Sequence, residues 1–497
     1  MPSILALDQG TTSSRALVVH QDGTILGVGQ REFPQHYPEP GWVEHDAEDL
    51  WHSTLDSARE ALTRSGAEPD AIGITNQRET LVVWDRATLG PVAPAIVWQD
   101  RRTAERCREL RAAGVEPDVR TRSGLVLDPY FTATKLEWLL RSADLRKRAE
   151  RGELAAGTVD AWLIARLTGG RVHATDPTNA SRTLLYNLAT GGWDPVLMRL
   201  FGIPDGMLPE VVPSCGVIAE TNAEIFGRPL PIAGIAGDQQ AALFGQGCVT
   251  PGDAKNTYGT GAFLLVYTGD TPPTPGAGLL ATAACGPGGR PGFALEGSVF
   301  IAGAAMQWLR DGLGLLARAS DSEVLARSVP DTGGVYFVPA FVGLGSPHWE
   351  PGARGTITGL TRGTTAAQLV RAGLEAMAFS SSDLLEGMLG SAALALTHFR
   401  VDGGATSNDW LMQFQADLLG VPVERPDCVE TTALGAACLA GLAVGVWPSI
   451  EAFTPTRRFT RFEPRSSPSE RARRIGEWRR AVSAALHWAR APVSGTA

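Results

Sequence analysis

Two short glycine–threonine segments in this sequence have the residue types that bind phosphate groups. One is Gly10-Thr11-Thr12-Ser13 and the other is Gly259-Thr260-Gly261. Glycine permits positive φ and close approach of a ligand, and the exposed N–H and hydroxyl groups can donate to phosphate oxygens. Either segment alone is typical of an ordinary hairpin turn. Because each lies beside an expected strand, one in each half of the chain, the pair predicts one site shared by two halves.

A carboxylate stands at a matching point in each expected strand–turn unit of the first half. Asp8 follows the apolar run 4–7, and Asp238 follows the apolar run 232–236. Open α/β sheets bind ligands at the C-terminal ends of strands, and phosphoryl transfer needs a metal-organising carboxylate and a base beside the attacking hydroxyl. Taken singly, each aspartate also fits a simple turn former. A Walker A loop is excluded because the sequence has no Gly-Lys pair.

The elements around these residues alternate between strands and helices. The segments at both hairpins have a strand–turn–strand pattern, and helical periodicity follows at 50–62. This alternation predicts an α/β fold. Since the two halves open with the same device, we expect an internally duplicated fold with a cleft between an N-terminal domain (1–248) and a C-terminal domain (249–497). Turn residues at 246–253 supply the boundary.

Composition limits the classes of function. A chain of 497 residues exceeds the ~250–300 residues that one core supports. Its net charge of -9 argues against a nucleic-acid partner. The six cysteines are scattered, which indicates reduced thiols. The start of the sequence does not have the pattern of a signal peptide, and we expect a cytoplasmic protein.

Three further segments have patterns that predict local structure. The uncharged run 433–447 is shorter than the ~20 residues of a membrane span and predicts a buried helix with closely packed small residues, so no membrane span is expected. An amphipathic helix is predicted for 468–490. The Gly- and Pro-rich stretch 269–292 predicts surface loops.

Seven strings of this sequence, in family order, resemble the FGGY carbohydrate kinase family, and within it the members that phosphorylate glycerol. The wider family is also resembled at 135–138 and 355–379. The family belongs to the actin-like ATPases, so the resemblance implies two duplicated ribonuclease-H-like domains with ATP and Mg²⁺ between them. The seven strings are residues 8–15, 40–46, 73–79, 96–102, 234–245, 256–261 and 401–404.

The resemblance also implies roles for individual positions. Asp8 is expected to organise Mg²⁺ and Asp238 to act as the catalytic base. The residues expected to bind the nucleotide and its phosphates are Thr11, Thr12, Ser13, Arg15, Thr260, Gly303, Gln307, Gly404 and Asn408. The residues expected to hold glycerol are Arg78, Glu79, Trp98, Tyr130, Asp238, Gln239 and Phe263.

The expected polyol pocket is chemically coherent. Each glycerol hydroxyl both donates and accepts, so its site needs mixed partners: Arg78 only donates, and Glu79 only accepts. The aromatic faces of Trp98 and Phe263 cover C–H groups and exclude water, although for either residue alone packing in the core is the simpler reading.

The loop 221–229 departs from other members of the family. It lacks the glycine-rich basic segment that some members use to bind fructose bisphosphate. Glu224 stands where others carry a histidine that the phosphotransferase system phosphorylates. We therefore expect neither mode of regulation.

Three alternatives to a glycerol-phosphorylating enzyme follow from the sequence. The first is a family member acting on xylulose, gluconate or a similar sugar, against which Arg78-Glu79 and Trp98 argue because larger substrates need a roomier pocket. The second is an ATP-driven clamp or filament, and the third is a scaffold that binds no nucleotide. We also expect a homo-oligomer, either a dimer or a tetramer.

Overall fold

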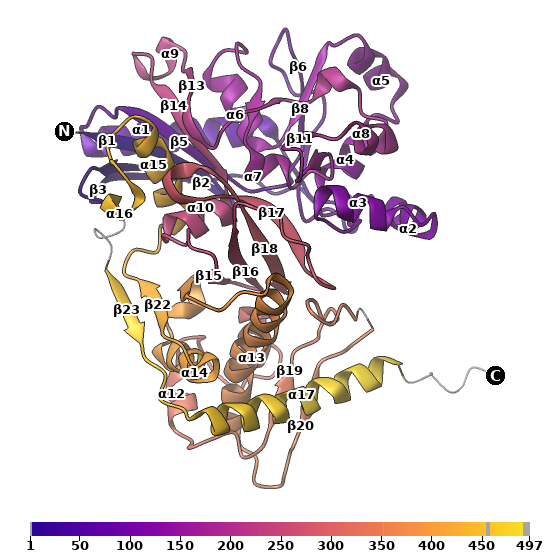
Figure 1. The fold of residues 1–497 in the computed structure, drawn as a ribbon, viewed down its shortest axis with the longest axis vertical. Coiled ribbons are helices and arrows are strands. Elements are labelled where there is room, and N and C mark those ends of the chain that lie inside the picture. Colours follow the sequence, from indigo (N-terminus) through magenta and orange to yellow (C-terminus); the bar gives the residue numbers. More distant parts are fainter. Residues whose placement is uncertain (1, 351, 454–457, 491–497) are drawn as a thin grey trace.

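The protein folds around two mixed β-sheets, seen one above the other in the computed structural model (Figure 1). The structure describes residues 2–350, 352–453 and 458–490. The first sheet has the order β13-β14-β5-β1-β2-β3 and the second β17-β18-β16-β15-β21-β22-β23. The strands of the first sheet are β1 (Ser3–Gln9), β2 (Ser13–His20), β3 (Ile25–Glu32), β5 (Ala71–Asn76), β13 (Cys215–Glu220) and β14 (Pro231–Gly237). Those of the second are β15 (Asp253–Tyr258), β16 (Ala262–Gly269), β17 (Leu280–Cys285), β18 (Pro291–Val299), β21 (His398–Asp402), β22 (Val423–Pro426) and β23 (Phe459–Phe462).

The two sheets repeat one topology. In the first, β3, β2 and β1 are antiparallel neighbours, β5 and β14 continue in parallel, and β13 closes the edge antiparallel. In the second, β18, β16 and β15 are antiparallel, β21 and β22 are parallel, and β23 closes antiparallel. Strand β17 is an addition at the other edge. This correspondence confirms the predicted duplicated α/β fold, while the boundary at residue 248 stays a prediction.

Register aligns the ends of three parallel strands in the first sheet. Asp8 of β1 lies opposite Thr75 of β5, and Ala236 of β14 lies opposite the same threonine. The residues that follow β5 and β14 therefore emerge at the edge of the sheet where Asp8 lies. This is the edge at which ligands bind in open α/β sheets.

A helix from the second half of the chain completes the core of the first sheet. Helix α15 (Thr431–Ala443) is buried against β1, β14 and α10 (Asp238–Gly245) (Figure 1). Small residues make this contact possible: a Cβ added at Gly73 would lie 2.2 Å from the Ala436 carbonyl, and one at Gly435 would lie 1.9 Å from that of Ala241. The predicted buried helix is thus present, although it ends before Gly445, whose φ is 78°.

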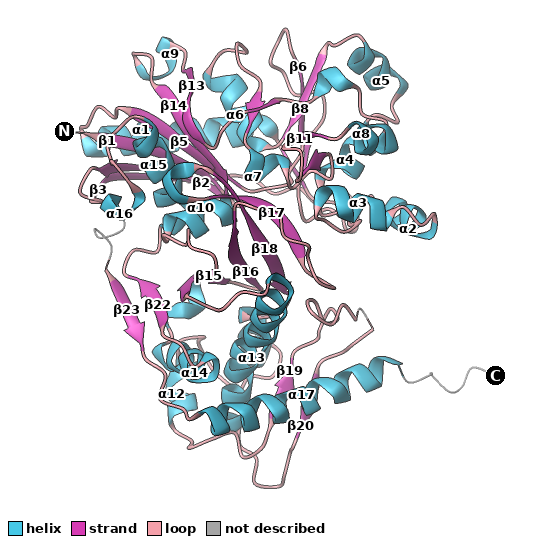
Figure 2. Ribbon diagram, viewed as in Figure 1, coloured by secondary structure: helices cyan, strands magenta, loops and turns pink. Residues whose placement is uncertain are grey.

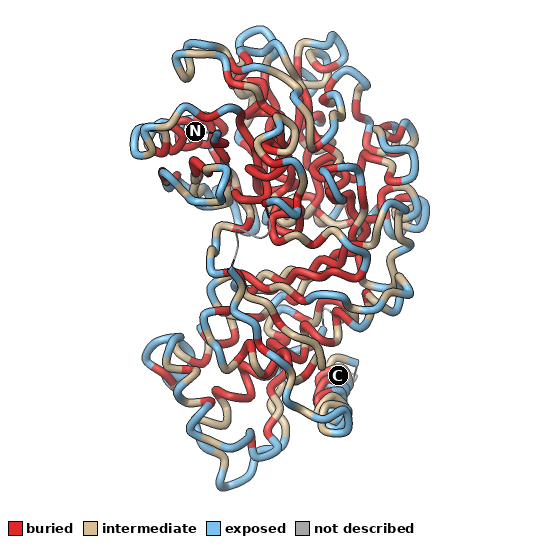
Figure 3. Tube along the Cα trace, turned by 60° about the vertical axis from the view of Figure 1, so that its left-hand side comes forward, coloured by how far each residue is buried: buried red, intermediate tan, exposed pale blue. Residues whose placement is uncertain are grey.

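Helices pack on both sheets, and burial follows the strands through the molecule (Figures 2 and 3). The long α13 (Ala366–Ala392) starts at a capping box formed by Thr365 and Gln368, and α17 (Pro468–Arg490) has the predicted bounds. None of the helices in the described ranges has the length and apolarity needed to span a membrane. The prediction of loops throughout 269–292 is wrong, because the buried strand β17 lies within it.

The remaining elements connect the sheets or decorate them. In the first half they are β4 (Glu44–His45), α1 (Ala47–Ser65), β6 (Val82–Asp85), β7 (Ala95–Ile96), α2 (Ala104–Ala112), α3 (Glu116–Ser123), α4 (Thr132–Leu139), α5 (Ala143–Glu150), β8 (Leu154–Gly157), α6 (Val159–Leu167), β9 (Ala174–Thr175), α7 (Pro177–Ala180), β10 (Tyr186–Asn187), β11 (Gly192–Trp193), α8 (Pro195–Phe201), β12 (Glu210–Val211) and α9 (Ala223–Phe226). In the second half they are α11 (Gly303–Asp311), α12 (Asp321–Arg327), β19 (Tyr336–Val338), β20 (Thr356–Thr358), α14 (Asp409–Leu419) and α16 (Ile450–Phe453).

Candidate active site

Two predicted carboxylates meet at the aligned strand ends of the first sheet. Burial, and next the negative charges of Asp238 and Glu430, raise the pKa of Asp8 to about 7, although the positive charge of Arg15 opposes them. Glu430 immediately precedes α15, so the helix that completes the core also brings a third carboxylate to this edge. Within the described ranges no three acidic, His or Cys side chains form a ready-made metal site. The carboxylates of Asp8, Asp238 and Glu430 repel one another, and a bound cation would reduce this repulsion.

Arg78 joins both sheets through a buried set of ion pairs. Its Nε lies 3.1 Å from the Oδ1 atom of Asp238. Its Nη1 and Nη2 donate to the two oxygens of Glu296 at 2.6 and 3.1 Å. Arg78 follows β5 in the first sheet, whereas Glu296 lies on β18 in the second. The pair therefore links the two halves at the predicted substrate site.

A second arginine completes this network. Arg182 donates through Nε to Glu79 at 2.6 Å and through Nη2 to Glu296 at 3.0 Å. Burial by itself would raise the pKa of Glu296, but the neighbouring guanidinium groups of Arg182 and Arg78 lower this pKa to about 2. Two guanidinium groups thus face two buried carboxylates. Sequence reasoning did not find Arg182 or Glu296, because their partners lie more than 100 residues away in the chain.

Glu79 has a backbone conformation that is uncommon for its residue type. Its φ is 61°, in the left-handed region. Lys135 stabilises this turn by donating from Nζ to the Glu79 carbonyl at 3.1 Å and to the Tyr130 carbonyl at 2.8 Å. Such strain is typical of functional sites, where the surroundings hold the backbone in place.

An aromatic wall lies beside the first phosphate hairpin. The rings of Trp98 and Tyr130 meet edge to face with centroids 5.6 Å apart. The indole Nε1 of Trp98 donates to Thr11 Oγ1 at 3.0 Å, which joins the predicted polyol pocket to the predicted phosphate site. Phe263 lies on β16 opposite Thr257, and both are half-buried.

The first hairpin turns tightly, with the Gly10 amide donating to the Ser13 carbonyl at 3.0 Å. Thr12 is exposed at its tip. Arg15, predicted to bind phosphate, is paired with Glu430 and also donates to Gln30 at 2.5 Å. In this structure its guanidinium group therefore already has partners, and a phosphate would compete with them.

The second hairpin borders a cavity of about 360 Å³ in the second domain. The Gly303 and Ala304 amides donate to the hairpin carbonyls of Gly259 and Thr260, which fixes the start of α11 against the hairpin. A Cβ at Gly303 would lie 2.6 Å from the Gly259 carbonyl. All five second-domain residues predicted to bind nucleotide line this cavity, together with the apolar side chains of Met306, Leu374 and Met377; the five are Thr260, Gly303, Gln307, Gly404 and Asn408.

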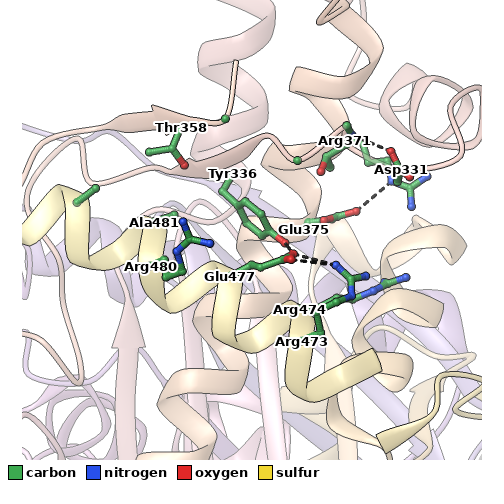
Figure 4. A pocket seen from close by; sticks show the side chains of 15 residues that line it. Asp331, Tyr336, Thr358, Arg371, Glu375, Arg473, Arg474, Glu477, Arg480 and Ala481 are labelled. Carbon is green, nitrogen blue, oxygen red and sulfur yellow. Dashed lines mark hydrogen bonds and ion pairs between the residues drawn. The ribbon is translucent and has the colours of Figure 1, made fainter. Parts of the chain in front are cut away.

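A larger cavity, of about 630 Å³, lies between α13, α17 and the paired strands β19 and β20. Figure 4 shows the side chains that line it. None of the predicted site residues lines it. Many of its charged groups are paired with one another: Arg473 lies 2.9 Å from Glu477, and Arg371 lies 3.0 Å from Glu375. It is therefore not the candidate active site.

The comparisons with known proteins agree with this geometry. A family model for the N-terminal domain of the FGGY family of carbohydrate kinases matches residues 3–245, and the model for the C-terminal domain matches residues 254–444. The chain belongs to this family. It is 58% identical to a glycerol kinase of Trichlorobacter lovleyi, over 98% of this chain and 100% of that protein. It is 56% identical to a glycerol kinase of Ralstonia nicotianae, over 97% of this chain and 98% of the relative. The crystal structure of Plasmodium falciparum glycerol kinase with ADP superimposes with a TM-score of 0.93 at 34% identity and covers 98% of both chains.

Proposed function

We propose that this chain is an ATP:glycerol 3-phosphotransferase, which transfers the γ-phosphoryl group of ATP to a terminal hydroxyl of glycerol and yields sn-glycerol 3-phosphate and ADP. The product would feed glycerol catabolism and glycerolipid synthesis. The observation that carries the proposal is the pairing of Arg78 with Asp238 and Glu296 at the aligned strand ends. The glycerol kinases that match nearly the whole chain support it.

The polyol is held by groups of both hydrogen-bonding types in this proposal. Glu79 accepts from one hydroxyl, and Arg78 and the Gln239 amide donate to others. Trp98 and Phe263 cover the carbon skeleton and exclude water, which otherwise competes for the phosphoryl group. Tyr130, whose ring meets that of Trp98 edge to face, offers a hydroxyl that can donate and accept.

Asp238 is the proposed general base. Burial raises the pKa of its carboxyl group above the ordinary value, although Arg78, the backbone N–H of Gln239 and Lys255 lower it, and a raised pKa makes the carboxylate a better proton acceptor. In the proposed step the hydroxyl oxygen bonds to the γ-phosphorus as the bond to the β-phosphate oxygen of ATP breaks. The hydroxyl proton passes to Asp238, and ADP leaves.

The acidic edge suits Mg²⁺, which usually binds through one or two carboxylates and the substrate phosphates while it keeps several waters. Asp8 would hold it, with Asp238 and Glu430 nearby. The ion would neutralise charge that develops on the phosphate oxygens. Thr11, Thr12, Ser13 and Thr260 would donate to these oxygens from the two hairpins, and the cavity lined by Gln307 and Asn408 would receive the nucleoside.

A substrate panel tests this function. Purified protein with ATP and Mg²⁺ is assayed for ADP release on glycerol, both propanediols, xylulose and gluconate. Removing one hydroxyl leaves buried polar groups unpaired, so each propanediol is expected to have a kcat/KM at least about 10²-fold below that of glycerol. A higher kcat/KM on xylulose or gluconate would replace glycerol with a sugar substrate. ADP release that is independent of every polyol would favour an ATP-driven clamp.

Two wider features complete the proposal. All six cysteines are free thiols, which suits the reducing cytoplasm. A homodimer or homotetramer is proposed, and light scattering coupled to size-exclusion chromatography measures which forms.

A further inference from the structure

Lys255 is a buried cation beside the candidate substrate site. It lies on β15 with 0% of its surface exposed. Its Nζ donates to Gln239 Oε1 at 2.7 Å and to Thr257 Oγ1 at 2.6 Å. Both acceptors are neutral, and within the described ranges no carboxylate oxygen lies within 4.0 Å of this ammonium group.

Burial without an ion pair is costly for an ammonium group. Burial lowers the pKa of Lys255, the more distant carboxylates of Asp402, Asp238 and Glu296 raise it, and Arg78 lowers it. A methionine or leucine would fill a similar volume without this cost. The position of the charge therefore calls for a reason other than packing.

The contact with Gln239 defines the orientation of that amide. An ammonium group has three donors and no acceptor, so the atom that faces it must be the amide oxygen. The Nε2 group of Gln239 then points elsewhere, and among the described residues it has no hydrogen-bond partner. Gln239 is half-buried and follows Asp238, so its free donor lies beside the proposed base.

We propose that Lys255 is a positioning residue, which holds the Gln239 amide in the orientation that presents its NH₂ group to a substrate hydroxyl. The inference rests on the proposed function insofar as Gln239 binds the polyol. Without Lys255 the amide can rotate by 180°, and the site then presents an acceptor where the substrate needs a donor. Lys255 also contacts Thr257, three residues before Thr260, and thereby ties the substrate side to the second phosphate hairpin.

A double-mutant cycle between Lys255 and Gln239 tests the proposal. Lys255→Met is expected to raise the KM for the polyol by about 5–100-fold, the range for leaving a buried polar group badly paired, with the KM for ATP changed less than about 2-fold. In a Gln239→Ala background the same substitution is expected to have almost no further effect on the polyol KM, since the amide it positions is gone. Lys255→Arg keeps a donor and is expected to recover part of the loss. Lys147→Met, the same change at an exposed lysine, is the matched control and is expected to leave all constants unchanged.

Equal losses from Lys255→Met in both backgrounds would overturn the proposal, as would a fall in kcat with no change in polyol KM. Thermal unfolding is measured for every variant, and Thr257→Val serves if Lys255→Met does not fold. Thr257→Val removes the other acceptor but leaves Gln239 held, so a polyol KM within about 3-fold of wild type is expected, and a larger rise counts against the proposal. The cycle is run with whichever substrate the panel selects, so a failure of the glycerol assignment and a failure of this coupling are separate results.

Discussion

The Nε atom of Arg78 lies 3.1 Å from the Oδ1 atom of Asp238, and the same guanidinium group binds both oxygens of Glu296 from the opposite sheet. Arg78 thus holds the proposed base while it bridges the two domains. Since these contacts fix the Arg78 guanidinium and the Asp238 carboxylate relative to each other, the substrate side of the cleft is preorganised. Preorganised polar groups need no rearrangement as charge develops in the transition state.

Replacement of Asp238 by asparagine tests its role as the base. Asn keeps the shape but cannot accept the proton, so kcat is expected to fall by about 10²–10⁴-fold. ADP affinity, measured by calorimetry, should change little, because neither hairpin is altered. Near-normal turnover would remove Asp238 from the mechanism.

Glu430 forms an ion pair with Arg15 in the structure, and a nucleotide phosphate bound by Arg15 would compete with it. Glu430→Gln removes this ion pair and one negative charge near Asp8. Binding of ADP without Mg²⁺ is therefore expected to tighten by about 3–10-fold, a gain of about 1 kcal/mol from reduced electrostatic competition. Gln30→Ala, which removes a neutral partner of Arg15, is the control and should have a smaller effect. Weaker ADP binding in Glu430→Gln would contradict the competition.

Removal of the Glu296 charge is expected to destabilise the fold. Glu296→Gln leaves Arg78 and Arg182 buried with one carboxylate fewer, and breaking a buried ion network in this way costs about 3–5 kcal/mol. Urea unfolding followed by circular dichroism measures the loss. Glu386→Gln, which removes an exposed partner of Arg479, is expected to cost under about 1 kcal/mol. Equal effects of the two changes would show that the buried network contributes no special stability.

The buried Asp160, which lies on α6 and away from the cleft, should make stability depend on pH. Burial, and next the charge of Asp176, raise the pKa of its carboxyl group to about 7. The folded state holds this proton more tightly than the unfolded state. The protonated Asp160 carboxyl group therefore makes its full contribution to the free energy of unfolding below about pH 4, and this contribution is lost as the pH rises through 7. Between pH 5 and pH 8 the wild-type protein should therefore lose about 2–3 kcal/mol more of its free energy of unfolding than the Asp160→Asn variant, which cannot titrate at this position. Parallel pH curves for the two proteins would contradict the shift.

Local patterns predicted the elements whose signals are local. Helix α17 has its predicted bounds because a proline starts it and its apolar period is regular. The carboxylates Asp8 and Asp238 were predicted at strand ends because apolar runs lead directly to them.

Elements defined by distant partners were not predictable in this way. Strand β17, Leu-Ala-Thr-Ala-Ala-Cys, has one β-branched residue, Thr282, and no aromatic residue, and it forms because β18 pairs with it along its whole length. In the sequence, Glu296 and Lys255 are isolated charged residues within strands, and no surrounding motif indicates that either has a role. Their significance comes from contacts with Arg78 and Gln239, which only the folded chain brings together.

The last prediction concerns regulation, where the loop after β13 departs from the family. Phosphorylation of a loop histidine adds roughly two negative charges that reorder the surrounding chain. Glu224 at this position is exposed on the short α9 and cannot carry a stable phosphoryl group. Arg228, the one cation in the loop 221–229, donates to the Pro69 carbonyl at 2.5 Å. Activity is therefore expected to change less than about 2-fold with millimolar fructose bisphosphate or with phosphorylated phosphotransferase carrier protein, because neither ligand finds the several donors that anion binding needs. A several-fold change with either one, measured by ADP release at subsaturating glycerol, would show that another surface of this enzyme receives the signal.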